Sequence, residues 1–225
     1  IKIIGLTGGQ GAGKTTITQI LKLILEIKYN LSVVCFSIDD FYKTLSERTS
    51  LAKNINKLFK TRGVPGTHDT NLINKIFIDL NKKKFRPLLV PRFDKSRDDR
   101  FPKKYWQKIK KKPKIIIFEG WCVGARSQKN KDLLKPINTL ERKKDLDLKW
   151  RSRVNNELKN AYKKIFSKID ILIFLKVPSF NSVYKWRLLQ EKKLQLTLKS
   201  KKTMSPLQVR NFIMYYERIT MQMLK

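Results

Sequence analysis

The sequence has few of the side chains that build disulfide scaffolds and zinc sites. Its 225 residues include only two cysteines, Cys35 and Cys122, and a single histidine, His68. Both cysteines fall in or beside apolar segments, which indicates buried free thiols in a reducing compartment rather than a disulfide. No Cys/His spacing is typical of zinc. These absences exclude a small disulfide-stapled domain and a zinc-dependent function.

Long apolar runs are absent as well. No apolar stretch approaches the roughly 20 residues that a membrane-spanning helix needs, and the amino terminus does not resemble a signal peptide. We therefore expect a cytoplasmic protein without a membrane partner. The sequence alone does not set its oligomeric state.

Acidic residues are scarce, with 18 Asp and Glu against 51 Lys and Arg, so that the formal net charge is +33. Such a charge favours nucleic acid or an anionic membrane as partner. The lysines, however, are scattered along the whole chain, with local runs at 108–112 and 199–202 as the best candidate patches. We interpret most of them as a solvated surface and do not expect nucleic acid to be the main partner.

What the chain does contain is an alternation of short β-branched apolar segments with helical patterns. Strands are predicted at 1–6, 31–38, 114–118 and 169–177, and helices at 14–27, 70–82, 150–167, 179–196 and 205–224. This alternation predicts an α/β domain with a central parallel sheet and helices on both faces. Ligands of such sheets bind at the carboxyl ends of the strands. The polar stretch 41–113 interrupts the pattern, and we expect it to be a functional insertion in a single domain.

Four glycines crowd between the first predicted strand and the first predicted helix. The spacing Gly8-x4-Gly13-Lys14-Thr15 matches the phosphate-binding loop called Walker A, whose backbone N–H groups cradle a nucleotide's phosphates. A glycine turn with an incidental lysine explains neither Lys14 nor the hydroxyl beside it. We therefore predict that this loop contacts a nucleotide through Gly8, Gly9, Gln10, Gly11, Ala12, Gly13, Lys14, Thr15 and Thr16.

Acidic residues follow two of the predicted strands. Asp39 and Asp40 come after the second strand, where one could accept a proton from an attacking hydroxyl or help to hold Mg²⁺. The alternative is that an Asp, most naturally Asp40, caps the next helix. Glu119 follows the third strand, which is the Walker B arrangement of an acid that orders a metal and its waters.

Cationic and imidazole side chains occupy the polar loops. His68 lies in a turn next to Asp69, where a structural bond to Asp69 and a contact with substrate are both open interpretations. Arg187, on the predicted helix after the fourth strand, is a candidate site residue or a surface charge. In a chain so rich in lysine, arginines in the polar loops indicate bidentate recognition of phosphate or carboxylate. Four arginines occur in these loops: Arg62, Arg92, Arg100 and Arg126.

The segments GGQGAGKTT, SIDDFY, RGVPGTHD, PRFDKS, FEGWCVGAR, WRLLQE and YYERIT follow one another in the order in which they occur in plant-type D-glycerate 3-kinases. Through nearly its whole length the chain resembles that family of P-loop kinases, which is related to uridine kinase, phosphoribulokinase and pantothenate kinase. The resemblance implies the three-layer P-loop NTPase kinase fold, the cofactors ATP and Mg²⁺, and transfer of the γ-phosphoryl group to a hydroxyl of D-glycerate.

The resemblance also assigns roles to particular residues. Lys14, Asp39, Glu119 and Arg187 are expected to be catalytic, with Asp39 rather than Asp40 as the acid of the motif and Arg187 as a lid arginine. Thr15, Asp39 and Glu119 are expected to hold Mg²⁺. The acceptor contacts are expected to come from Asp39 and from five residues of the loops: Tyr42, Arg62, His68, Arg100 and Arg126.

Some features depart from the family. The loop between Ser96 and Arg100 is shorter than in relatives, and the family's last strand, after the helix that carries YYERIT, does not follow here. Together with a start that has no Met, this indicates a segment truncated at both ends. Two alternatives stay open: a kinase for another small anionic or hydroxylated metabolite, and a nucleotide-dependent regulatory or nucleic-acid-binding ATPase.

Overall fold

The computed structural model describes residues 1–198 and 203–225, so the lysine run at 199–202 lies outside the described residues. Along the chain the elements are β1 (Lys2–Gly8), α1 (Lys14–Ile27), β2 (Val33–Ser37), the 3-10 turn η1 (Ile38–Phe41), α2 (Leu45–Asn54), η2 (Lys57–Lys60), α3 (Thr70–Asn81), β3 (Leu88–Val90), β4 (Phe93–Asp94), β5 (Asp99–Arg100), η3 (Lys103–Tyr105), β6 (Gln107–Ile109), β7 (Ile115–Glu119), α4 (Asn130–Leu134), α5 (Thr139–Lys144), α6 (Lys149–Glu157), the π-helical turn η4 (Leu158–Tyr162), α7 (Lys163–Phe166), β8 (Ile171–Leu175), α8 (Phe180–Leu198) and α9 (Pro206–Met223).

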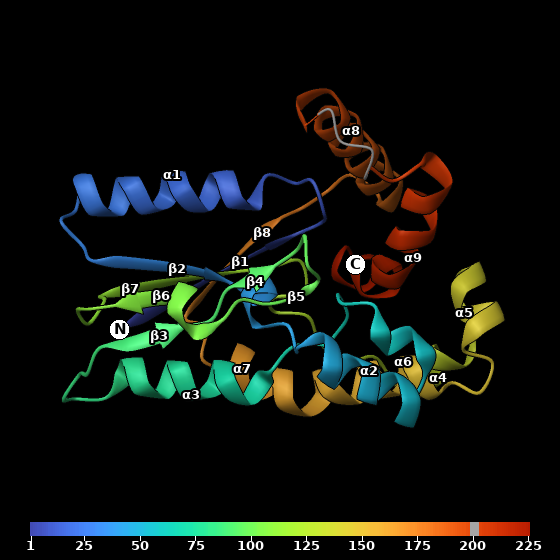
Figure 1. Ribbon diagram of the computed structural model, residues 1–225, viewed down its shortest axis with the longest axis horizontal. Coiled ribbons are helices and arrows are strands. Elements are labelled where there is room, and N and C mark those ends of the chain that lie inside the picture. The colour runs from blue at the N-terminus through green and yellow to red at the C-terminus, as the bar shows by residue number, and fades with distance from the viewer. Residues whose placement is uncertain (199–202) are drawn as a thin grey trace.

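The centre of the fold is a parallel sheet in the order β2-β7-β1-β8. Ile4 of β1 pairs with Ile117 of β7 on one side and with Ile171 of β8 on the other. Helix α1 covers one face of the sheet, and α3 and α7 lie on the other (Figure 1). The predicted α/β architecture with helices on both faces is therefore confirmed.

Two apolar clusters hold these layers together. On the α3 side, the rings of Phe36, Phe77 and Phe118 contact one another with centroids 5.3 to 5.9 Å apart. On the α1 side, Leu6 and Ile117 are fully buried beneath the helix. Burial on both faces is the reason that the central strands β1 and β7 read as continuous apolar runs rather than as alternating ones, whereas the edge strand β8 is exposed to half-buried.

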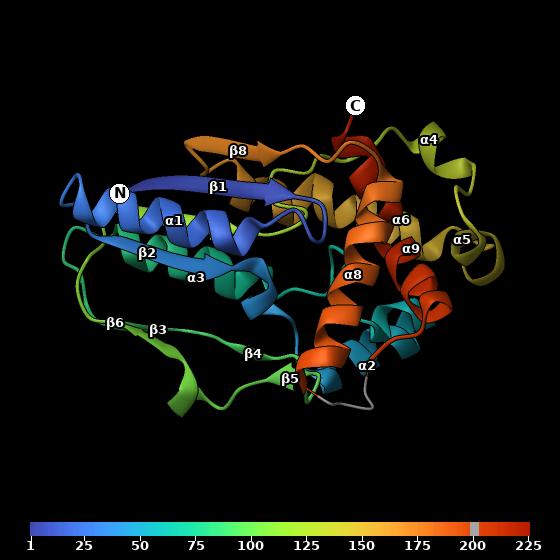
Figure 2. The same cartoon turned by 90° about the horizontal axis from the view of Figure 1, so that it is seen from above.

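The carboxyl ends of the strands meet at one edge of the sheet, because all the strands of this sheet are parallel. In Figure 2 the arrowheads of β1, β2 and β8 point toward the end of the sheet where α8 lies. Gly8, Ser37 and Glu119 are the last residues of β1, β2 and β7, so that the predicted motifs come together there.

The insertion 41–113 contains more regular structure than the sequence pattern predicts. Besides α2 and α3, it forms two short antiparallel pairs, β3 with β6 and β4 with β5. The helix predicted at 150–167 is divided into α6, η4 and α7, and the wider π turn keeps both Leu158 and Tyr162 buried. Among the described residues, no helix has the length and apolar character needed to span a membrane.

Candidate active site

The predicted phosphate loop runs from the end of β1 to the start of α1. Gly11 and Gly13 both have φ near 81°, a left-handed conformation that residues with a side chain adopt at a cost. A Cβ atom on Gly11 would also lie 2.7 Å from the Cβ of Trp186. These two glycines let the loop turn tightly, and the helix that follows begins at Lys14 with its amino end directed at the loop, a suitable place for anionic phosphates.

Lys14 folds back onto the loop. Its Nζ donates hydrogen bonds of 3.0 Å to the carbonyl oxygens of Gly8 and Gly9. Burial lowers the pKa of the Lys14 ammonium, and the nearby carboxylates of Glu119 and Asp39 offset only part of that effect. The ammonium therefore lies at the loop with two carboxylates near it, and it can exchange the two carbonyls for phosphate oxygens.

Asp39 follows β2 and is held by two side-chain donors. Its Oδ1 accepts a hydrogen bond of 3.0 Å from the hydroxyl of Tyr42, and its Oδ2 accepts one of 2.8 Å from Nζ of Lys95. Burial by itself would raise the pKa of Asp39, but the charge and hydrogen bond of Lys95, together with weaker contributions such as the hydrogen bond from Tyr42, keep the pKa below its usual value. Asp39 is therefore an ionised carboxylate, as a general base must be.

Asp40, the neighbouring acid, faces the backbone instead. Its carboxylate accepts from the amides of Ser37 at 3.3 Å and Phe93 at 3.4 Å, which closes a capping box around η1. Burial raises the pKa of Asp40 above its usual value. The structure thus gives Asp40 a capping role that ties β2 to β4.

Glu119 ends β7 between β2 and β1, where it pairs in register with Ser37 and with Leu6. Burial raises the pKa of Glu119, and a hydrogen bond from Ser37 opposes that shift. Among the described residues there is no cluster of three or more His, Cys, Asp or Glu side chains that could hold a metal. That is compatible with Mg²⁺, which usually takes one or two carboxylates besides substrate phosphates and water.

A cavity of about 590 Å³ joins these groups at the carboxyl end of the sheet. Its wall contains Asp39, Tyr42 and Glu119 together with three cations, Arg62, Lys95 and Arg187. The phosphate loop contributes Gln10, Gly11, Gly13, Lys14, Thr15 and Thr16, while Gly8, Gly9 and Ala12 form the rest of the loop and are not part of the wall.

Arg187 reaches the cavity from α8. It forms an ion pair of 2.5 Å with Glu191 one turn further along the helix, and its guanidinium lies 5.7 Å from the centre of the Phe212 ring. Phe212 belongs to α9, so this arginine lies where α8 and α9 meet above the phosphate loop.

Other predicted acceptor contacts lie outside the cavity wall. His68 is buried and stacks on the ring of Tyr42 at 4.4 Å, with its Nδ1 2.6 Å from the hydroxyl of Tyr162. Burial lowers the pKa of His68 to about 3, so the ring is neutral. Its observed contacts are structural: it supports Tyr42 from behind.

Three arginines of the polar loops are likewise not part of that wall. Arg100 donates a hydrogen bond of 2.8 Å to the carbonyl oxygen of Tyr42 and lies 3.5 Å from a carboxylate oxygen of Asp69. Arg126 is exposed and borders a separate cavity next to α7. Arg92, also exposed, has its guanidinium 5.9 Å from the centre of the Phe101 ring. The polar loops that carry these arginines therefore do not all converge on one place.

Several residues of the cavity wall are not among the site residues expected from the sequence. Lys95, Trp121 and Tyr216 stand within the segments PRFDKS, FEGWCVGAR and YYERIT, and that position is the sequence signal that could have found them. The indole N–H of Trp121 donates a 3.1 Å hydrogen bond to the carbonyl of Gly63, and its ring lies 4.8 Å from that of Tyr216 on α9. Together these aromatic rings form one side of the cavity.

Known proteins match both the sequence and the fold. Residues 3–160 match the model of the phosphoribulokinase/uridine kinase family. An uncharacterized kinase of Schizosaccharomyces pombe is 37% identical over 95% of this chain and 78% of its own length. The chloroplastic D-glycerate 3-kinase of Arabidopsis thaliana is 29% identical over 95% of this chain, which spans only 46% of the plant protein. A solved D-glycerate 3-kinase structure from Cryptococcus neoformans, 26% identical, superimposes with a TM-score of 0.81 over 96% of this chain and 76% of that one.

Proposed function

Because the chain belongs to the phosphoribulokinase/uridine kinase family, we propose that this kinase transfers the γ-phosphoryl group of ATP to D-glycerate and forms 3-phosphoglycerate. The observation that carries the proposal is that one cavity contains a phosphate loop, an ionised Asp39 and the cationic Arg62. The names of the Arabidopsis and Cryptococcus relatives support D-glycerate as the acceptor.

The nucleotide end of the cavity is the phosphate loop. When ATP binds, the backbone N–H groups of the loop and the amino end of α1 contact its phosphates, and Lys14 moves from the carbonyls of Gly8 and Gly9 to phosphate oxygens. Thr15, Asp39 and Glu119 offer the hard oxygen atoms that would hold Mg²⁺. When bound, the ion neutralises charge that develops on the β- and γ-phosphates.

The reacting end of the cavity is Asp39. The acceptor's hydroxyl oxygen forms a bond to the γ-phosphorus while the bond from that phosphorus to the β,γ-bridging oxygen breaks, so that ADP leaves. Asp39 takes the hydroxyl proton, and the hydroxyl of Tyr42 orients the carboxylate through its 3.0 Å hydrogen bond. Lys95 is within reach of the same carboxylate and keeps it ionised.

The cations at the acceptor end favour an anionic acceptor. Arg62 borders the same cavity as Asp39 and carries the planar guanidinium that matches a carboxylate. With the carboxylate of D-glycerate bound to Arg62, the hydroxyl at the other end of this short molecule is directed toward Asp39 and the phosphate loop. Such orientation supplies a large share of the rate in phosphoryl transfer.

A screen of purified protein with ATP and a panel of hydroxy acids, polyols and nucleosides tests this function. We expect turnover with D-glycerate and very poor turnover with glycerol, which has the same carbon skeleton without the carboxylate. Equal efficiency with glycerol or uridine would rule out carboxylate recognition. ATP turnover that requires RNA instead of an organic acid would overturn the kinase assignment to a small acid.

A further inference from the structure

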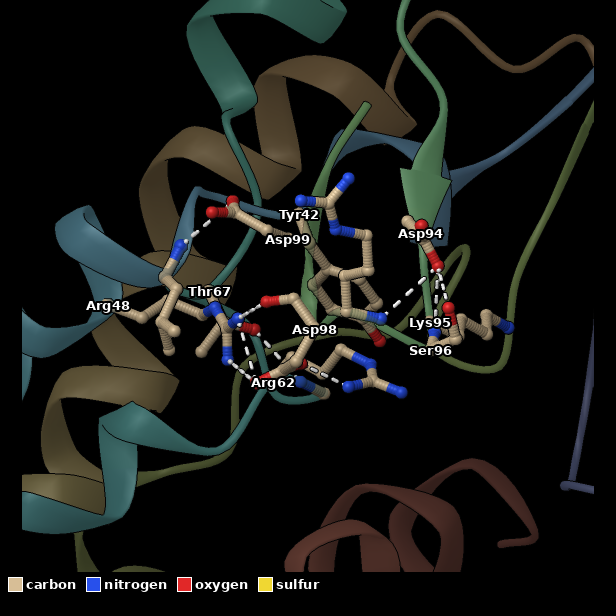
Figure 3. A network of polar contacts seen from close by, with 12 residues as sticks. Tyr42, Arg48, Arg62, Thr67, Asp94, Lys95, Ser96, Asp98 and Asp99 are labelled. Carbon is tan, nitrogen blue, oxygen red and sulfur yellow. Dashed lines mark hydrogen bonds and ion pairs between the residues drawn. The ribbon is translucent and has the colours of Figure 1, made fainter. Parts of the chain in front are cut away.

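Asp98, which the sequence motifs did not single out, bonds two arginines at once (Figure 3). It lies in the turn between β4 and β5. One of its carboxylate oxygens, Oδ1, pairs with Nη1 of Arg62, the cation of the cavity wall. The other, Oδ2, lies 3.1 Å from Nη2 of Arg48. The residue therefore bridges the acceptor end of the site to the body of the insertion.

Arg48 anchors Asp98 from behind. Its side chain is completely buried, and it donates to the carbonyl oxygens of Lys60 at 2.7 Å, Lys43 at 3.2 Å and Asp98 itself at 2.5 Å. A buried guanidinium is costly to leave without an opposite charge, so the pair with Asp98 is strongly favoured. The carboxylate of Asp98 is thereby fixed in place before any acceptor arrives.

The ring of Phe93 packs against both guanidinium groups. The centre of its ring lies 5.4 Å from the guanidinium carbon of Arg62 and 5.8 Å from that of Arg48. The guanidinium of Arg62 thus contacts the ring of Phe93, and its Nη1 pairs with the carboxylate of Asp98. These two contacts restrict the rotation of the Arg62 side chain. Within the described part of the chain, Nε and Nη2 of Arg62 have no hydrogen-bond partner, so that edge of the guanidinium is free to bind another anion.

The backbone of Asp98 is itself in an uncommon conformation, with φ of 55°. Asp tolerates this left-handed region better than most residues, yet such a conformation persists only where the surrounding contacts enforce it. Here the enforcing contacts are those of Arg48 with both the carbonyl and the carboxylate of Asp98.

We infer that Asp98 is a positioning residue that aims the free edge of Arg62 at the anionic group of the acceptor. The inference rests on the proposed function and deepens it: the site selects a small acid, because a guanidinium held in this way offers two parallel donors to a carboxylate. Asp98 does not touch the acceptor. Its effect passes through Arg62, so that loss of the Asp98 charge should weaken acceptor binding without affecting the nucleotide end.

The first test is steady-state kinetics of Asp98→Asn, which keeps the size of the side chain and suits the left-handed backbone. We expect KM for the acceptor to rise about tenfold, because the guanidinium is no longer pre-oriented, while KM for ATP stays within about twofold. The matched control is Asp94→Asn on the same hairpin, where the carboxylate accepts only local bonds from Ser96 and Arg97. An equal rise of KM in both variants would mean a general hairpin defect and would overturn the inference.

The second test is a double-mutant cycle with Arg62→Lys. If Asp98 acts through Arg62, Asp98→Asn should change the acceptor KM much less in the Arg62→Lys background than in the wild type. The same fold-change in both backgrounds would show that Asp98 has only a structural role. Loss of the Arg48 contact lowers stability in both backgrounds equally, so it cancels in this comparison.

A third measurement does not depend on turnover. Phenylglyoxal modifies accessible guanidinium groups, and peptide mapping gives a rate for each arginine. We expect Arg62 to react several-fold faster in Asp98→Asn than in the wild type, with exposed Arg126 unchanged as the internal reference. An unchanged rate at Arg62 refutes the positioning contact. Faster modification of Arg62 in a protein that phosphorylates no hydroxy acid would instead refute the proposed function and leave the contact standing.

Discussion

Lys95 and Asp39, 56 positions apart in the sequence, are joined by a 2.8 Å ion pair between Nζ and Oδ2. This pair places a cation on the carboxylate that we propose as the general base. The pair stabilises the ionised form of Asp39, which is the form that accepts a proton. Lys95 lies on the same β4–β5 hairpin that carries Asp98. The short hairpin therefore contacts both the proposed base, Asp39, and Arg62, the arginine that we propose binds the acceptor.

Removal of the Lys14 amino group should abolish ATP-dependent phosphoryl transfer. Lys14→Ala takes away the cation that offsets charge moving onto the β- and γ-phosphates. The measurement is product formation, with circular dichroism as the control for folding. Activity within a few-fold of the wild type would rule out the phosphate-loop interpretation of Gly8–Lys14.

The two acids after β2 should differ strongly in their effect on turnover. Asp39→Asn should lower kcat by roughly 10²–10⁴, the usual range for a positioned general base. Asp40→Asn should cost about tenfold or less, because the single amide oxygen of Asn can still accept from one of the two amides, Ser37 or Phe93, and Asp40 only caps η1. A larger loss of kcat in Asp40→Asn than in Asp39→Asn would identify Asp40 as the general base instead.

The ion pair between Lys95 and Asp39 should determine the pH below which activity is lost. The proposed mechanism requires ionised Asp39, and without the Lys95 cation burial becomes the dominant influence and raises the pKa of that carboxyl. Lys95→Met should therefore shift the acid limb of kcat/KM to higher pH, by about one unit or more for the loss of a close opposite charge. Lys103→Met, which changes an exposed lysine of the same insertion, is the control. A limb that stays in place in Lys95→Met would contradict the role of Asp39.

Arginines inside and outside the cavity should respond differently to replacement by Lys. Arg62→Lys keeps the charge and loses the planar fork, so kcat/KM for D-glycerate should fall by about tenfold or more while KM for ATP changes little. Arg126→Lys should have almost no effect, because Arg126 is exposed beside a separate cavity. A large loss in Arg126→Lys would restore it as an acceptor contact.

His68 should make the folded state sensitive to acid. Its pKa is about 3 in the folded protein and near 6.5 in the unfolded chain, so between these values the unfolded chain binds the proton and stability falls as the pH falls. From pH 7 to pH 5 the loss due to His68 should be about 2 kcal/mol. Urea denaturation at the two pH values measures it, with His68→Gln as the comparison. The pH-dependent loss should be smaller by that amount in the variant.

The sequence by itself determined the class of fold and the phosphate loop. Both follow from short-range features: strands buried on two faces read as β-branched runs, and the loop needs glycines whose backbone turns left-handed directly before Lys14. The acid after a predicted strand was also readable, because parallel strands bring their carboxyl ends to one edge. Asp39 and Glu119 lie in the same cavity for that reason.

Only the tertiary structure decided which loop residues share that cavity. Arg62 and Arg126 looked equivalent in the sequence, yet Arg62 lies in the wall of the same cavity as Asp39, whereas Arg126 is exposed beside a separate cavity. Lys95 reaches Asp39, and Asp98 reaches Arg62 across 36 positions and Arg48 across 50. These contacts depend on how the insertion folds back over the end of the sheet. Local sequence patterns do not encode this arrangement of the insertion, because packing between residues far apart in the chain determines it.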